Sequence, residues 1–175
     1  YDPDASDDYP LPKEDWVDMG LPSGTLWARC NVGTVVPQSA GLYFSWGNIQ
    51  GHHWNGSAFD DGYVFSPANY QLTPGYLLDH NIDAEHDAAQ EYLGEHWKIP
   101  STTEFEELIQ NCDIEQYNWL SIRCIRLVSK INKNFIIIPI TGMAFTGGIW
   151  SGLTTSIVAT SDFYNSTQFK TAVFN

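Results

Sequence analysis

Apolar residues recur at helical spacing in one stretch near the middle of the chain. The i, i+3, i+4, i+7 pattern that places side chains on one helix face is followed by Phe105, Leu108, Ile109 and Cys112. Ser101 is a good N-cap, and Glu104 three residues later completes a capping box. Trp97 and Pro100 precede this helix in a short extended segment. We therefore expect a strand-to-helix corner with a buried Trp97 ring, against which the other elements pack.

A second helix is predicted just upstream, over residues 83–94. Asp83 stands at its N-cap, and Gly94 follows as the stop. A string of acids resembling calcium ligands runs through Asp79, Asp83, Glu85 and Asp87. It lacks the loop glycine and the closing Glu of an EF-hand, so capping and helix-start charge explain it better.

Alternating or apolar runs predict strands on both sides of these helices. Residues 16–21 and 25–32 indicate a hairpin, and residues 41–47 form a short aromatic strand. A second hairpin is expected from 122–129 and 134–139, the latter apolar on both faces and so central. Residues 149–151 and 169–174 are further strands, while 48–73 form a long irregular region. Strands, two adjacent helices and more strands are typical of an α+β fold.

Composition and charge limit the classes of partner that this chain can bind. The 175 residues carry a formal net charge of −13, from 8 basic and 21 acidic residues. Nucleic acid and anionic membranes are poor partners for such a surface, and no apolar run is long enough to span a bilayer. Residues 1–15 are acidic and proline-bearing, which predicts a flexible arm before a single domain over 16–175.

The three cysteines are Cys30, Cys112 and Cys124. Their spacings match no zinc pattern, and nothing else indicates a metal or a cofactor. We expect three small buried apolar side chains. If one disulfide forms, Cys30–Cys112 is the expected pair.

Three stretches in order resemble a known family. They are residues 17–33 (VDMGLPSGTLWARCNVG), 43–47 (YFSWG), and 86–89 (HDAA) running into 97–102 (WKIPST). Together they resemble the Fibrobacter major paralogous domain family, common in surface lipoproteins of Bacteroidetes-type bacteria. The segment W-x-I-P-S-T-T-E-F is also similar to one in the wider C-type-lectin-like group. The resemblance implies a C-type-lectin-like fold, with two helices against small antiparallel sheets and a loop-rich ligand face in the C-terminal half.

Two features depart from that group. Family members usually end in a strand reading Gly-x-Ser-Val-Arg-Pro, which this sequence lacks. We expect either that this end is missing here or that the sheet is completed otherwise, for example by a strand from a neighbouring chain. Calcium-dependent lectins use Glu-Pro-Asn and Trp-Asn-Asp ligand sets, and neither occurs here. Calcium-dependent sugar binding is therefore not expected.

A late segment combines aromatic and small polar residues in the manner of a paratope. Taken alone, this composition also fits an ordinary exposed loop, and the resemblance favours a binding face. The candidate ligand-binding residues are Trp150, Ser151, Thr154, Thr155, Ser161, Asp162, Phe163, Tyr164, Asn165, Thr167 and Gln168, with Trp46 and Trp54 as neighbours.

The irregular region holds His52, His53 and Trp54, followed by Asp60 and Asp61. Adjacent histidines point in opposite directions on a strand, which argues against a two-histidine metal site. A surface loop is the simpler interpretation, and a Trp54 that stacks on a sugar is the sharper alternative.

No catalytic motif is present, and no pair of carboxylates stands out. The C-type-lectin-like group that the motifs resemble includes formylglycine-generating enzymes, whose reaction needs a redox-capable cysteine pair late in the chain. The last cysteine here is Cys124, which argues against this enzyme branch. The sequence predicts a non-enzymatic, extracellular or surface-anchored module that binds a glycan or a protein. The alternatives are a structural subunit of a surface assembly such as a pilus, with strand exchange between chains, and an enzyme acting on polysaccharide.

Overall fold

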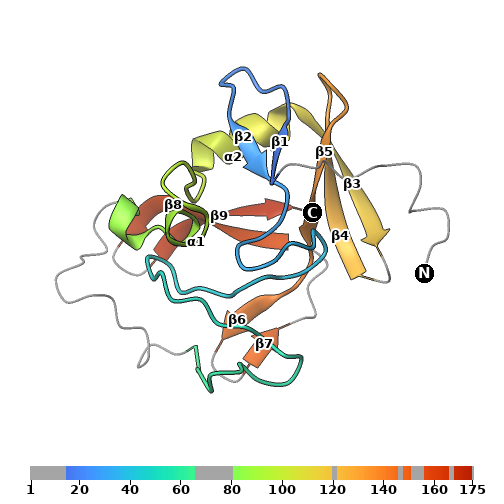
Figure 1. The fold of residues 1–175 in the computed structure, drawn as a ribbon. Coiled ribbons are helices and arrows are strands. Elements are labelled where there is room, and N and C mark those ends of the chain that lie inside the picture. Colours follow the sequence, from blue (N-terminus) through green and yellow to red (C-terminus); the bar gives the residue numbers. More distant parts are fainter. Residues whose placement is uncertain are drawn as a thin grey trace.

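The structure is a computed structural model that describes residues 15–65, 81–119, 122–145, 148–150, 156–165 and 168–174. Figure 1 shows these parts as helices and a long loop packed with small antiparallel sheets. All but the last residue of the predicted arm, 1–15, lies outside the described residues.

The described elements are mixed helix and strand, which confirms the α+β class. The strands are β1 (Trp16–Asp18), β2 (Leu26–Ala28), β3 (Cys112–Trp119), β4 (Ile122–Ser129), β5 (Phe135–Pro139), β6 (Met143–Phe145), β7 (Gly148–Trp150), β8 (Ser156–Asn165) and β9 (Gln168–Phe174). The helical segments are the 3₁₀ helix η1 (Ala84–His86), α1 (Ala88–Leu93) and α2 (Thr102–Gln110). The strands pair antiparallel as β1–β2, β3–β4–β5, β6–β7 and β8–β9.

The main core forms where α2 meets β1, β2 and the β3–β4–β5 sheet. Phe105 and Leu108 are buried on the predicted face of α2, with Ile109 packed against them. Around them lie Val17, Met19, Leu21, Trp27, Cys112, Ile125, Leu127 and Ile136. The amphipathic helix was thus correctly predicted, although Cys112 opens β3 rather than closing the helix.

The indole that anchors this core is Trp27, not Trp97. The Trp27 ring is 8% exposed and lies 5.0 Å from that of Phe105. Trp97 is only half-buried, because it belongs to an exposed connection after the Gly94 turn, where its N–H donates to the Gly94 carbonyl. The prediction of a buried Trp97 is therefore wrong.

The predicted helix 83–94 is interrupted at Asp87. Asp83 caps the 3₁₀ turn η1, and Asp87 is extended, with φ −91° and ψ 106°. The side chain of Asp87 caps α1 by accepting from the N–H groups of Ala89 and Gln90. These two acids are thus helix caps, as expected, while Asp79 lies outside the described residues.

The second hairpin is present, but its central strand is β4 and not β5. β4 pairs with β5 on one side and with β3 on the other. We did not predict β3, because Cys112–Trp119 follows the helix at once and reads as mostly polar. Within the described residues β5 is an edge of this sheet, and its apolar run reflects packing on both faces.

The C-terminal half is rich in strands rather than loops. β7 and β9 match the predicted strands closely, whereas β6 and β8 were missed. The Ser, Thr and Asn content of Ser156–Asn165 hides a strand that pairs with β9, the next strand along the chain. Conversely, the predicted strand 41–47 is reduced to one bridge between Tyr43 and His52.

The cysteines form no disulfide. Cys30, Cys112 and Cys124 are free thiols, so the conditional pairing of Cys30 with Cys112 does not arise. Cys112 and Cys124 are buried, as expected, and Cys30 is half-buried. Burial raises the pKa of Cys112 and of Cys124 to about 11, so both remain protonated and unreactive at neutral pH.

Candidate functional site

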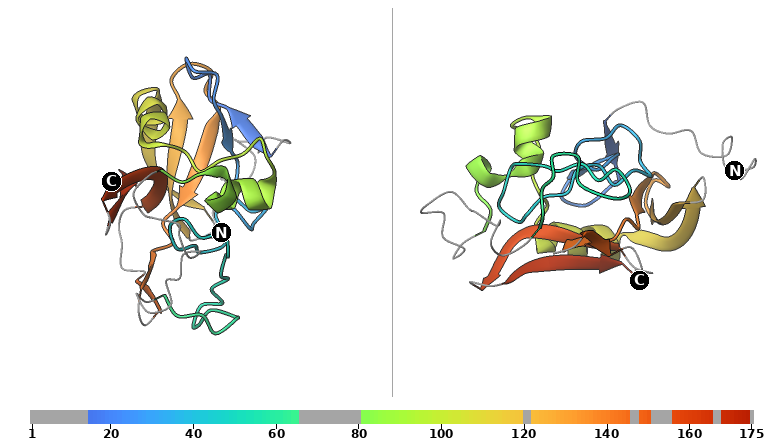
Figure 2. Two further views of the ribbon diagram at one scale, coloured as in Figure 1. Left: turned by 90° about the vertical axis from the view of Figure 1, so that its left-hand side faces the viewer. Right: turned by 90° about the horizontal axis from the view of Figure 1, so that it is seen from below.

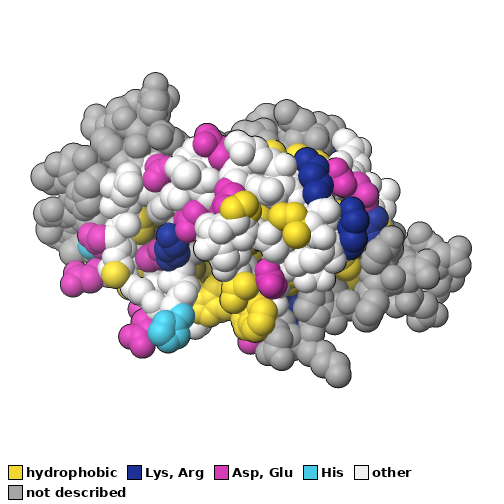
Figure 3. All heavy atoms as spheres, turned by 90° about the horizontal axis from the view of Figure 1, so that it is seen from above, with side chains coloured by type: hydrophobic (Ala, Val, Ile, Leu, Met, Phe, Trp, Pro, Cys, Tyr) yellow, Lys and Arg dark blue, Asp and Glu magenta, His cyan; other side chains and the backbone are white. Residues whose placement is uncertain are grey.

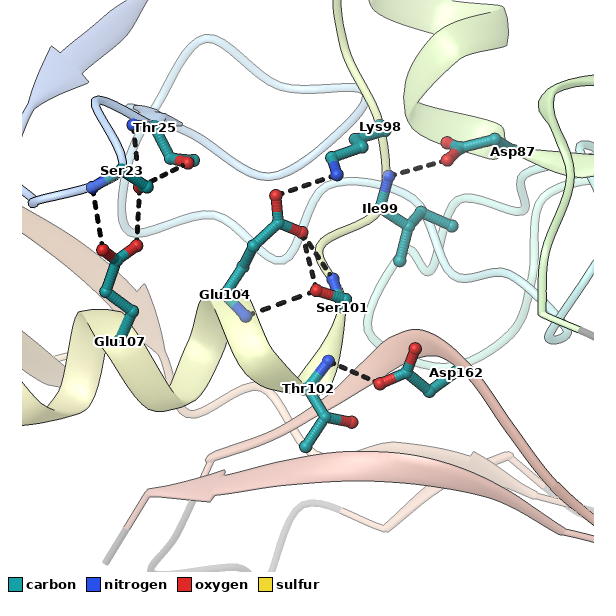
Figure 4. Close-up of polar contacts among 10 residues, drawn as sticks. All are labelled: Ser23, Thr25, Asp87, Lys98, Ile99, Ser101, Thr102, Glu104, Glu107 and Asp162. Atoms are coloured by element: carbon teal, nitrogen blue, oxygen red, sulfur yellow. Dashed lines mark hydrogen bonds and ion pairs between the residues drawn. The ribbon is translucent and has the colours of Figure 1, made fainter.

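The start of α2 is held by a closed set of polar contacts (Figure 4). Ser101 accepts the Glu104 N–H, and the Glu104 carboxylate accepts from the N–H and hydroxyl of Ser101. Lys98 Nζ lies 2.8 Å from the other oxygen of Glu104. Burial raises the pKa of Glu104, but hydrogen bonds from Lys98 and Ser101 outweigh it, so that pKa lies below its ordinary value. The predicted capping box is confirmed, and it fixes the corner rigidly.

Strand β8 is fastened to this corner. The Ser161 N–H donates to the Pro100 carbonyl at 3.0 Å, and the Ser161 carbonyl accepts from Ile82 N–H at 2.9 Å. One residue on, the Asp162 carboxylate accepts from the Thr102 N–H at 2.8 Å, as Figure 4 shows. That N–H opens α2, where the helix macrodipole favours a negative charge. The clamp, defined as Thr160, Ser161 and Asp162, thus joins β8 to the start of α2 and to Ile82, which lies just before η1.

Trp46 closes the clamp from another side. Its indole N–H donates to the Thr160 carbonyl at 2.8 Å, and the two residues are 7% and 0% exposed. A ring buried this deeply, with its N–H used, supports β8 from beneath. Trp46 therefore has a structural role and does not offer a ligand its ring.

The other predicted residues of the C-terminal half lie before and after the clamp along the chain. Phe163, Tyr164 and Asn165 complete β8, Gln168 opens β9, and Trp150 ends β7. The β8–β9 register shifts between Ala159 and Phe163 and again before Asn165. Such irregularities re-aim side chains and are frequent beside functional sites. Outside the described residues lie Ser151, Thr154, Thr155 and Thr167.

The loop of residues 43–65 lies beside the β6–β7 hairpin in Figures 1 and 2. A hydrogen bond from the Tyr43 hydroxyl to the Thr141 carbonyl, 3.0 Å, ties the two together. Burial raises the pKa of Tyr43, although this hydrogen bond acts in the opposite direction. The loop therefore borders the strand that contains Trp150.

An aromatic cluster gives this loop a small core of its own. Phe59 is 5% exposed and contacts the rings of Tyr43, His52, Trp54 and Phe65. His52 is 2% exposed and stacks on Tyr63 with ring centroids 3.7 Å apart. The segment is irregular in secondary structure but internally packed, so the surface-loop interpretation is wrong for His52.

Residues 52–61, which we call the tip, form a miniature hairpin. Trp54 bridges to Phe59, the Asp60 N–H donates to the His53 carbonyl, and the Asn55 N–H donates to the Ala58 carbonyl. The Asn55 side chain accepts from the N–H groups of Ser57 and Ala58 and so shapes the turn. Asn-Gly at 55–56 is a strong hairpin signal that could have revealed this element from sequence.

Each histidine of the tip pairs with a different aspartate. His52 Nδ1 lies 2.6 Å from Asp61 Oδ2, and His53 Nδ1 lies 2.6 Å from Asp60 Oδ2. The Tyr63 N–H and then His52 hold the pKa of Asp61 below its ordinary value. The hydrogen bonds from His53 and then from Asn55 do the same for Asp60. Both carboxylates are therefore ionised acceptors at neutral pH.

The wider surface is acidic. Figure 3 shows acidic side chains spread over the face seen from above, whereas Lys and Arg are few and lie mostly to the right. Among the described residues, no three His, Cys, Asp or Glu side chains lie close enough together to hold a metal ion. None of the described helices has the length and apolarity needed to cross a bilayer.

Comparisons with protein-family models, with curated proteins and with solved structures found no match for this chain. The candidate site must therefore be judged on its geometry. The elements that carry the candidate residues are the β8–β9 ribbon beyond the clamp, the β6–β7 hairpin, and the loop that contains the tip.

Proposed function

We propose that this chain is a non-enzymatic recognition module of C-type-lectin-like architecture, belonging to the surface-lipoprotein family that its motifs resemble. It would bind a glycan or protein ligand outside the cell or on its outer surface. The contact face consists of the β8–β9 ribbon beyond the clamp, the end of β7 and the tip.

The clamp is the observation that supports this proposal. Thr160, Ser161 and Asp162 are each bound to a different part of the scaffold, immediately before Phe163, Tyr164 and Asn165. A strand fixed at that point loses little conformational entropy when a ligand binds to the residues that follow it. Aromatic residues next to small polar residues on a rigid base suit adaptable recognition.

A glycan array and a pull-down from the same preparation test the proposal. We expect a ligand whose binding is lost when Trp150, Phe163 and Tyr164 are all changed to Ala. A matched control changes Trp16, Leu26 and Ile131, which are exposed at the other end of the fold. If the triple variant bound as well as the unaltered protein, the assignment to this face would be wrong.

The absence of catalysis stays a prediction. Incubation of the protein with polysaccharides, followed by a reducing-sugar assay, tests it directly. To exclude a contaminant as the source, sugar release must persist through purification and be lost when Asp60 and Asp61 are substituted. Such a result would show that the protein is an enzyme and contradict the proposal.

A second candidate function, strand exchange within a surface assembly, is favoured by one observation. In the part of the chain that the structure describes, β9 pairs with β8 alone, so its other edge has no strand beside it. Edges of this kind add strands from other chains. Light scattering distinguishes strand exchange from the recognition function by measuring self-association of Thr171→Pro, with Thr25→Pro as the control. A Pro in β9 should abolish self-association only if the open edge of β9 mediates it.

A further inference from the structure

The tip has two faces with different chemistry. Because Trp54 lies opposite Phe59, antiparallel register places His52 opposite Asp61 and His53 opposite Asp60. Phe59 contacts the rings of both Trp54 and His52, at 5.0 Å and 6.3 Å. Trp54 and Asp61 therefore share the Phe59 face, while the His53–Asp60 pair lies on the other.

The Trp54 ring is held in place, but part of its surface and its indole N–H remain available to a ligand. Phe59 holds its ring in an edge-to-face contact, and the residue remains partly exposed. Within the described part of the chain its indole N–H donates to no protein atom. Trp46 differs, because its indole N–H donates to the Thr160 carbonyl.

Asp61 is likewise fixed and still accessible. Its side chain is 43% exposed, yet Oδ2 is held by the buried His52 and Oδ1 accepts from Tyr63 N–H at 3.0 Å. A carboxylate accepts about four hydrogen bonds, so two acceptor positions remain. Asp61 lies two positions beyond Phe59, the residue opposite Trp54, and so is the diagonal neighbour of Trp54 on the same face. Diagonal neighbours across an antiparallel pair are roughly 7–8 Å apart between backbone atoms.

We infer that Trp54 and Asp61 form a subsite for a neutral pyranose sugar. The apolar C–H face of the ring would stack on the indole, while two hydroxyls donate to Asp61 and a ring substituent accepts from the indole N–H. The distance between the Trp54 indole and the Asp61 carboxylate is about the width of one pyranose ring, which suits this ligand. Asp60 and Asp61, in a chain of net charge −13, disfavour uronic and sialic acids.

This inference rests on the proposed recognition function and names a ligand class for one part of its face. It also gives His52 a role. Buried under the cluster, the imidazole holds Asp61 in place, as a supporting residue does behind a directly binding one.

The test is an NMR titration with methyl glucoside, galactoside and mannoside, and with methyl glucuronide as the anionic comparison. The Trp54 indole N–H resonance is assigned by its loss in Trp54→Ala. We expect one or more neutral pyranosides to shift it with a Kd of about 1–10 mM, since the contact is small. The glucuronide should cause no shift.

Variants then identify the residues. Trp54→Ala should abolish binding and Asp61→Asn should weaken it about 10-fold, that is by about 1.4 kcal/mol. Trp16→Ala, another partly exposed Trp, should bind normally. An unchanged Trp46 indole resonance in each variant shows that the fold is kept.

Three results would overturn the inference: no shift with any neutral pyranoside, full affinity in Asp61→Asn, or equal binding of the glucuronide. If pyranosides bind and only the Trp150, Phe163 and Tyr164 triple variant loses them, the recognition function stands and this subsite does not. If no pyranoside binds, the array and pull-down decide the function separately.

Discussion

Two tryptophans close together in the sequence serve opposite purposes. Trp46 is 7% exposed and donates its indole N–H to the Thr160 carbonyl. Trp54 is partly exposed, packs edge-on against Phe59, and keeps its N–H outside the hydrogen bonds of the described chain. The difference shows that residue type alone does not decide whether an indole N–H is used within the fold; the groups that surround the ring do.

The carboxylates of the two regions differ in the same way. Around the clamp, Asp87 and Asp162 accept from backbone N–H groups of the helix starts and of Ile99. At the tip, Asp60 and Asp61 are exposed and pair mainly with histidine side chains. The first set fixes the scaffold, and the second set remains available to solvent or ligand.

Removing the Trp46 ring should have the largest effect on stability. Trp46→Ala empties a buried site and leaves the Thr160 carbonyl without its donor, which should lower the free energy of unfolding by about 3–5 kcal/mol. Trp54→Ala, the matched change at the tip, should cost about 1 kcal/mol. Urea unfolding followed by circular dichroism measures both, and equal losses would remove the contrast between the regions.

Asp87→Ala should have the next largest effect. This 5% exposed side chain accepts three backbone N–H groups, so its removal leaves α1 uncapped and Ile99 N–H unpaired. We expect a loss of about 2 kcal/mol in the same urea assay. Asp83→Ala, which caps only the exposed 3₁₀ turn, is the control and should cost clearly less.

Asp162→Ala should be milder. It removes one half-buried carboxylate from the first N–H of α2, for an expected cost of about 1 kcal/mol. Asp113→Ala, on an exposed position of β3, provides the control. A change within error for Asp162 would show that the clamp depends on backbone contacts alone.

Acid should weaken the contacts of Asp61 at the tip. The pKa of Asp61 is held below its ordinary value by the Tyr63 N–H and then by His52, so its folded form binds a proton less readily than the unfolded chain does. Its contribution is therefore present above about pH 4 and is lost as pH falls through the lower folded value. The Tyr63 amide resonance should report this change, and Asp61→Asn should abolish it. A titration unaltered by that substitution would assign the change to another group.

How far the sequence predicts this molecule depends on how local the signals are. The capping box at Ser101 and Glu104 and the apolar face of α2 are local, and the structure has them. The contacts of β8 with Trp46, Ile82 and Pro100 join residues distant in the chain, which no periodicity records. The pairing of His52 with Asp61 is local, but it depends on an irregular hairpin that alternation alone does not predict. Of the predicted ligand residues, Trp46 was misassigned because an indole suits burial and binding equally, and only the Thr160 carbonyl decides between them.

The central claim is that β8 is fixed by the scaffold at the clamp, whereas the tip is a separate and weaker unit. Native-state hydrogen exchange tests it most directly, by comparing the Ser161 and Ile82 amides with those of Asn55 and Asp60. We expect the clamp amides to exchange only through global unfolding, at a rate that falls as overall stability rises. The tip amides should exchange through local opening, orders of magnitude faster. Exchange of the Ser161 amide as fast as that of Asp60 would contradict it.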